Sequence, residues 1–197
     1  MTITLDRLER ALARDAPLLL RPEYQPGHLV AAVAAVVRPG QTLDILLIRR
    51  ASFDTDPWSS HMAFPGGKLD QSDENLLATA VRETLEEVGV DLGRTADYLG
   101  QLPIVDVARH GRALQIHPFV FALKGSVEFR TNHEVDAVFW VALDSLSDGS
   151  RETSVFQESN GNRFRFPAWD VDGNPVWGLT YRMLRSLLTA LEESPHE

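Results

Sequence analysis

Three glutamates stand close together near the middle of the chain. Glu86 and Glu87 lie three and four residues after Glu83. On a helix that turns about 100° per residue, the three carboxylates therefore project from one edge. Like charges at this spacing cost an isolated helix roughly 0.2–0.5 kcal/mol per pair, and one neighbouring cation, Arg82, does not neutralise three. A divalent cation would, because carboxylate oxygens suit Mg²⁺. The alternative interpretation is a solvated acidic helix face.

A glycine-containing loop precedes these glutamates. Pro65, Gly66 and Gly67 follow one another, and no regular element tolerates that sequence in its interior. A Gly-Gly turn just before a helix lets the backbone approach a ligand closely. Each feature is common by itself, but the loop and the glutamates together are a strong indication of a functional site.

The helix that must carry the glutamates is predicted over residues 73–88. Ser72 or Asp73 can cap its start, and Gly89 is a natural terminator. Its inward stripe at helical spacing consists of Leu77, Ala80, Val81, Thr84, Leu85 and Val88.

Strands are predicted on both sides of this helix. An amphipathic helix is expected within residues 3–14, a buried strand over 29–37, its partner over 44–50, and a loop over 51–63. Further strands are expected near 97–104, 112–123, 125–130, 133–142, 154–158 and 162–167, and a helix from Trp177 onwards. Strands surrounding two or three helices indicate one α+β layered domain.

Composition limits the classes of function. The 197 residues suit a single domain, and the net charge of -9 repels nucleic acid and anionic membranes. The absence of cysteine excludes disulfides and thiolate metal sites and fits a cytoplasmic protein. The longest apolar run, residues 29–37, is far short of the ~20 residues of a membrane helix.

The central segment resembles the Nudix box of the Nudix hydrolases, G-x5-E-x7-R-E-U-x-E-E-x-G-U, where U is a bulky apolar residue. Residues 82–90 match the second half at every required position except Thr84. Counting back from Arg82 places the earlier glutamate at Glu74, and Gly67 then requires G-x6-E. The same extra residue is found in the coenzyme A pyrophosphatase branch of the family.

The resemblance implies an α/β/α sandwich with a mixed sheet and the box at about residues 67–90. The whole chain, 1–197, would form this one domain, with its first and last helices as additions. It implies hydrolysis of a nucleoside diphosphate derivative with Mg²⁺ or Mn²⁺. By position, Glu83, Glu86 and Glu87 would be metal ligands, Arg82 would orient Glu83, and Gly67 would hold the loop.

Residues before the box resemble the coenzyme A branch in part. The matches to its pattern are Leu46, Leu47, Arg50, Ala51, Phe64, Pro65, Gly66 and Gly67. An arginine of the pattern falls on Asp56, however, which disfavours a 3′-phosphate. Arg49 and Arg50 alternate on a strand, so at most one faces the site, and Arg50 is the expected substrate contact.

Several other residues are candidates by position. His61 and Lys68 flank the glycine loop and could contact a phosphate. Glu134 opens a strand where many Nudix members place a further carboxylate, as a metal ligand or general base, with Asp136 as its rival. Either Trp169 or Trp177 could stack on a base, although tryptophans more often fill cores.

The leading hypothesis is therefore a Mg²⁺-dependent pyrophosphohydrolase acting on a small nucleotide-type molecule. Coenzyme A derivatives, ADP-ribose, nucleotide sugars, dinucleotides and nucleoside triphosphates remain alternative substrates. A second hypothesis is a nucleotide sensor that does not cleave, and a third is a structural domain with an acidic helix. No nucleic acid or membrane partner is expected, and a homodimer is left open.

Overall fold

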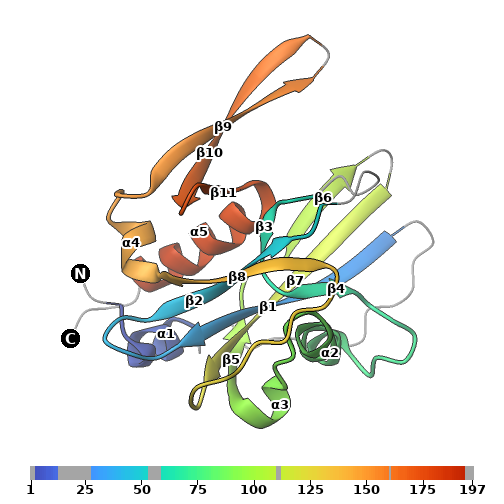
Figure 1. Cartoon of the computed structure of the whole chain (residues 1–197), viewed down its shortest axis with the longest axis vertical. Helices are drawn as coiled ribbons and strands as arrows, with labels where there is room; N and C mark the ends of the chain where they lie inside the picture. The colour runs from blue at the N-terminus through green and yellow to red at the C-terminus, as the bar shows by residue number, and fades with distance from the viewer. Residues whose placement is uncertain (1–2, 13–27, 53–58, 110–111, 160, 194–197) are drawn as a thin grey trace.

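The computed structural model describes residues 3–12, 28–52, 59–109, 112–159 and 161–193. Figure 1 shows a mixed sheet covered by helices on both faces, with a second, smaller sheet beside it. The elements in chain order are α1 Leu5–Leu12, β1 His28–Arg38, β2 Asp44–Arg50, β3 Met62–Ala63, β4 Gly66–Lys68, α2 Leu76–Val88, α3 Leu92–Thr95, β5 Ala96–Gln101, β6 Val105–Arg109, β7 Arg112–Leu123, β8 Val135–Ala142, α4 Leu143–Ser147, β9 Glu152–Ser159, β10 Asn162–Val171, β11 Asn174–Trp177 and α5 Gly178–Glu193.

The large sheet is built around β1 and β7, which run parallel to each other. Its main path is β3-β2-β1-β7-β5, with β4 paired to β1, β6 to β7 and β8 to β2. The β1–β2 hairpin pairs Val37 with Ile45, as the turn at Pro39-Gly40 predicted. The expected α+β fold with a mixed sheet between helices is confirmed.

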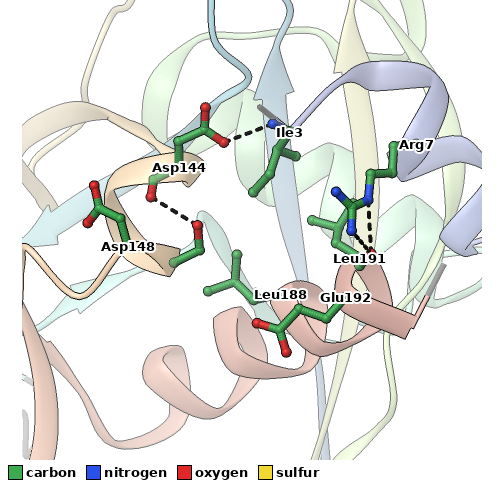
Figure 2. A pocket seen from close by; sticks show the side chains of 8 residues that line it. Ile3, Arg7, Asp144, Asp148, Leu188, Leu191 and Glu192 are labelled. Carbon is green, nitrogen blue, oxygen red and sulfur yellow. Dashed lines mark hydrogen bonds between the residues drawn. The ribbon is translucent and has the colours of Figure 1, made fainter. Parts of the chain in front are cut away.

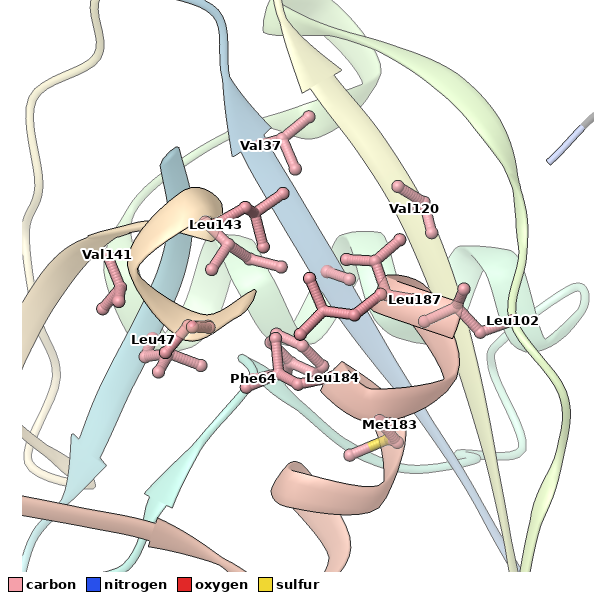
Figure 3. Close-up of a cluster of buried hydrophobic side chains, with 14 of the residues drawn as sticks. Val37, Leu47, Phe64, Leu102, Val120, Val141, Leu143, Met183, Leu184 and Leu187 are labelled. Atoms are coloured by element: carbon pink, nitrogen blue, oxygen red, sulfur yellow. The ribbon is translucent and has the colours of Figure 1, made fainter. Parts of the chain in front are cut away.

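The two faces of the sheet have separate apolar cores. On one face, α1 and α5 pack with Val37, Leu47 and Val120 of the sheet, together with Phe64 and Leu143 (Figure 3). On the other face, α2 packs through Leu76, Ala80 and Val88. Alternation along β2 explains the division, because Ile45 and Leu47 face the first core whereas Leu46 and Ile48 face the second.

The smaller sheet has the order β11-β10-β9. Its base joins the first core through the buried side chains of Trp169, Val171 and Val176. Beyond this base, β9 and the first part of β10 project from the body as a long two-stranded hairpin (Figure 1). Trp169 therefore fills the core, where it packs against Tyr181 with ring centroids 4.3 Å apart.

Some predicted boundaries are wrong. The helix of the three glutamates begins at Leu76, three residues later than expected, because Asn75 adopts the N-cap and accepts a hydrogen bond from the backbone of Ala78. Leu85, expected in the inward stripe, is 47% exposed. Residues 125–130 form no strand, and the strand predicted from 133 begins at Val135.

A cavity of about 310 Å³ lies between α1, α4 and α5 (Figure 2). Arg7 closes one side by donating through Nη2 and Nε to the carbonyl of Leu191, at 2.6 and 3.0 Å, and the backbone of Ile3 donates to Asp144 at 2.8 Å. None of the residues expected to do chemistry lines this cavity. Among the described residues, no helix is both long enough and apolar enough to cross a membrane.

Candidate active site

The glycine loop is an edge strand pressed against its neighbours. In β4, Gly66 pairs with Val33 and Gly67 with Ala32 of β1. A side chain on Gly66, which has a φ of 151°, would collide with the Ala32 carbonyl, and a Cβ on Gly67 would collide with the carboxylate of Glu83. Both glycines are therefore required by close packing, and the second places the loop directly on a predicted metal ligand.

Glu87 is the most enclosed of the three glutamates. It is 2% exposed, and its Oε2 accepts a hydrogen bond from the backbone of Gly66 at 2.8 Å. The pKa of Glu87 is raised to about 7, chiefly by burial and to a lesser extent by the charges of Glu83 and Glu134, while the Gly66 hydrogen bond and the charge of Arg50 lower it. Glu87 therefore gives up its proton less readily than an exposed glutamate does.

Arg82 holds the other two glutamates. Its Nη1 donates to Glu83 Oε1 at 3.0 Å and to Glu86 Oε2 at 3.2 Å. The side chain of Glu83 is 16% exposed and that of Glu86 is 53% exposed. Burial raises the pKa of Glu83, and its contact with Arg82 lowers it. The predicted orienting contact between Arg82 and Glu83 is present in the structure.

Asp73, which sequence reasoning took for a helix cap, positions Arg82 instead. Arg82 donates through Nε to Asp73 Oδ1 at 2.8 Å and through Nη2 to Oδ2 at 2.9 Å, a two-pronged ion pair. Asp73 is 5% exposed and also accepts from the hydroxyl of Thr79 and the backbone of Asp70. These bonds fix the guanidinium before any ligand arrives.

This contact changes the alignment of the first half of the box. Glu74 is exposed, so the acid that meets Arg82 is Asp73 and not Glu74. Gly67 and Asp73 then satisfy G-x5 followed by an acid, and the additional residue lies between Asp73 and Arg82. A box pattern that allows aspartate as well as glutamate six residues after the glycine would have identified Asp73 from the sequence.

Arg50 lies at the end of β2, and Glu134 lies directly before β8. The backbone of Ala51 donates to the Glu134 carbonyl at 2.8 Å, which ties the start of β8 to the residue after Arg50. The charge of Glu134 raises the pKa of both Glu83 and Glu87, and the charge of Arg50 lowers the pKa of Glu87. Both candidates therefore act electrostatically on the box glutamates.

Arg49 and Asp136 lie apart from this cluster. Arg49 donates through Nε to Asp136 at 2.8 Å and through Nη1 to Asn174 of β11, also at 2.8 Å. Since Asp136 is engaged there, the rival to Glu134 is not placed among the glutamates. Of the two arginines, only Arg50 acts on the charge of Glu87, and the strand is irregular between Arg49 and Arg50.

The flanking candidates occupy different surroundings. The ring of His61 lies 5.0 Å from that of Trp177, and its carbonyl accepts from the backbone of Arg50 at 3.0 Å. Lys68 is exposed, and its carbonyl accepts from Arg82 at 3.3 Å. Asp54 and Asp56, on which the argument about a 3′-phosphate rests, lie outside the described residues.

The donor set fits a hard divalent ion by its chemistry. Glu83, Glu86, Glu87 and Glu134 offer only carboxylate oxygens, and the burial of Glu87 favours compensation by a cation. In the described part of the chain, no three acidic or histidine side chains already converge as a metal site. Glu83 and Glu86, held here by Arg82, would have to turn toward Glu87 to share one ion.

Comparison with known proteins agrees with this geometry. The NUDIX domain family matches residues 28–159. Nudix hydrolase NudL of Pectobacterium atrosepticum is 30% identical over 181 residues, covering 91% of this chain and 90% of the relative.

Two solved structures share the fold. A MutT/nudix family protein from Enterococcus faecalis has a TM-score of 0.57 at 14% identity, covering 100% of this chain and 78% of its own. The NUDIX domain of Shewanella oneidensis NrtR, complexed with ADP ribose, has a TM-score of 0.50 at 21% identity, covering 64% of this chain and 82% of its own. The family match and the similarity to NudL over most of both chains show that this chain belongs to the Nudix hydrolase family.

Proposed function

We propose that this Nudix hydrolase cleaves the pyrophosphate bond of a nucleoside diphosphate derivative, with Mg²⁺ or Mn²⁺ held by Glu83, Glu86 and Glu87. The observation that carries the proposal is the packing of the glycine loop against two of these glutamates: Gly66 donates to Glu87, and Gly67 lies against the carboxylate of Glu83. The charges of Glu134 and Arg50 also act on Glu87. The bound ion would neutralise the pyrophosphate and lower the pKa of water.

The side chains of the site have distinct tasks in this proposal. Asp73 and Arg82 keep Glu83 and Glu86 on one side of the helix. Gly66 fixes Glu87 through its backbone N–H. Arg50 offers a guanidinium for a phosphate oxygen, and Glu134 orients the attacking water and accepts its proton. Lys68 and His61, which flank the glycine loop, contact a phosphate at the edge of the bound substrate.

The direct test is a substrate panel with Mg²⁺ and with Mn²⁺, read by the identity of the products. The panel contains coenzyme A, dephospho-coenzyme A, ADP-ribose, a nucleotide sugar, a diadenosine polyphosphate and nucleoside triphosphates. Release of two phosphorylated products from one class identifies the substrate. A chain that binds one of these compounds without cleaving it under either metal would instead be a nucleotide sensor.

We further propose that the preferred substrate lacks a 3′-phosphate. The sequence places Asp56 where the coenzyme A branch has an arginine, and Asp54 lies two residues earlier. Desolvating a phosphate dianion normally calls for arginine or lysine, and a nearby carboxylate repels it. Dephospho-coenzyme A, or another derivative without the 3′-phosphate, should therefore have the higher kcat/KM.

An Asp56→Arg variant sharpens this test. It restores the cation of the branch pattern, so kcat/KM for coenzyme A should rise about tenfold relative to the dephospho form. Asp54→Asn is the matched control, because it removes a neighbouring charge without supplying a guanidinium. A wild-type preference for coenzyme A would show that this part of the proposal is wrong.

A further inference from the structure

The projecting hairpin carries an unusual share of exposed aromatic surface. We call residues 152–159 and 162–167 the arm. The described residues include five large hydrophobic side chains that are strongly exposed, and three of these, Phe156, Phe164 and Phe166, belong to the arm at 50%, 48% and 38% exposure. Phe156 pairs with Arg165 and Phe164 pairs with Gln157, so Phe156 lies on one face of the arm and Phe164 and Phe166 lie on the other. Both faces of the arm therefore expose aromatic side chains, which are typical of interaction surfaces.

The arm also has an open backbone edge. Within the described chain, β9 pairs with β10 alone and is the outer strand of its sheet. Two strands projecting into water are marginally stable by themselves, and an eight-residue edge presents a row of N–H and C=O groups to a further strand. Proteins usually blunt such an edge with a proline, a lysine or an inward-facing charge, and β9 contains no proline or lysine.

Charge indicates what this edge meets. The arm contains Glu152 and Glu158 on β9 and Arg163 and Arg165 on β10, so it is neutral in a chain of net charge -9. Two copies can therefore bring their arms together while their acidic bodies stay apart. A polyanion would meet only two arginines, one of them already placed over Phe156 with its Cζ 4.0 Å from the ring centroid.

We propose that the arm is a dimerisation element, in which β9 of one copy pairs antiparallel with β9 of a second copy about a two-fold axis. Such self-pairing must place a residue opposite itself. Centring the pair on Phe156 stacks the two Phe156 rings and sets Glu158 opposite Ser154. Centring it on Val155 would instead set Glu152 opposite Glu158, so of these two registers the one centred on Phe156 is favoured.

The size of the arm sets the expected strength. A standard interface uses about 20–30 residues a side, whereas the arm has fewer. The dimer should therefore be weak, with a Kd of the order of micromolar, and its population should change with protein concentration. The NUDIX match ends at residue 159, so β10 lies beyond the segment that defines the family domain.

Sedimentation velocity of the full chain, from about 1 to 300 µM, tests the proposal. The mass should rise from 22.0 kDa toward twice that value with increasing concentration. Phe156→Lys and Phe156→Glu each place like charges face to face, and each should shift the midpoint at least about tenfold upward. An equimolar mixture of the two variants should recover the dimer, because opposite charges then meet.

Ile104→Lys is the matched control, because Ile104 is 45% exposed and lies off the arm. It should leave the dimer unchanged, and circular dichroism should show that all three variants are folded. A wild-type chain that stays monomeric throughout would overturn the proposal. So would a dimer that Phe156→Lys does not weaken, or variants whose mixture stays monomeric.

Discussion

At the scale of single residues, the site depends on carboxylates that the helix alone would disfavour. Glu87 is buried with one oxygen fixed by Gly66, whereas Glu86 is half exposed and accepts a hydrogen bond from Arg82. These surroundings differ enough for the roles of the two glutamates to be separated by mutation.

Glu86→Gln and Glu87→Gln should each lower kcat/KM by about 10²-fold or more. Each change removes a charge and keeps the shape, so the Tm should hold, and for Glu87 it should rise because a neutral side chain costs less to bury. Steady-state kinetics with Mg²⁺ and a thermal melt measure both. Near-normal turnover by both variants would contradict the metal assignment.

Asp73→Asn should destabilise the protein and lower its activity, whereas Glu74→Gln should do neither. Arg82 holds the pKa of Asp73 at about 2, below its usual 3.8. A carboxyl whose folded pKa is depressed stabilises the fold above its unfolded pKa and loses that contribution as pH falls through the folded pKa. The loss in Asp73→Asn should be about 2 kcal/mol near pH 7 and shrink between about pH 4 and 2.

Denaturant unfolding of both variants and the wild type across this pH range gives the measurement. If Asp73→Asn and Glu74→Gln changed stability and activity equally, Asp73 would not be established as the acidic residue of the box, and Glu74 would remain the candidate.

Glu134→Gln should lower kcat more than it raises KM, because an orienting base acts on the attacking water and not on substrate affinity. Asp136→Asn is the control, since Asp136 opens the same strand but pairs with Arg49 away from the glutamates. The pH–rate profile is the second readout. An unchanged rate and profile in Glu134→Gln would remove this residue from the site.

At the scale of elements, the position of the site rests on the contact between β4 and α2. Gly67 pairs with β1 and lies against Glu83. The three-residue strand β4 therefore determines where the carboxylate of Glu83 lies relative to the sheet. A side chain there has no space without moving the carboxylate.

Gly67→Ala should therefore reduce kcat/KM by about 10²-fold, with a Tm loss from the collision with Glu83. Gly125→Ala is the control, because a Cβ at that loop position meets nothing within 4 Å. Kinetics and melting of the two variants decide the matter. Full activity in Gly67→Ala would mean that the loop does not set the position of Glu83.

Periodicity in the sequence predicted the helices and strands that bury one regular face. It did not predict the side chains that bind a residue far away in the sequence instead of capping a helix or filling the core. The strands over 44–50 and 112–123 agree with β2 and β7 to the residue. Asn75 and Asp73 are both plausible caps by type, and only the fold shows that Asp73 turns to Arg82. The contributions of Glu134 and Arg50 depend on strand pairing across distant segments, which no local pattern encodes.

At the scale of the whole molecule, we propose that α1, α5 and the sheet form one folding unit. Leu8 and Leu12 of α1 share a core with Leu184 and Leu187 of α5, although these helices lie at opposite ends of the chain. Cooperative unfolding of the full chain in one transition, by circular dichroism and by tryptophan fluorescence, is the expected result.

The net charge of -9 gives the final prediction. A nucleoside diphosphate derivative is also anionic, so the field of the protein should slow its approach, and salt should screen this repulsion. At saturating Mg²⁺, kcat/KM should therefore rise about two- to tenfold as NaCl increases from about 10 to 150 mM, the reverse of an electrostatically steered enzyme. KCl in place of NaCl controls for specific ions, and the Tm controls for stability. A fall in kcat/KM with salt would show that Arg50 and Lys68 outweigh the acidic body at the site entrance.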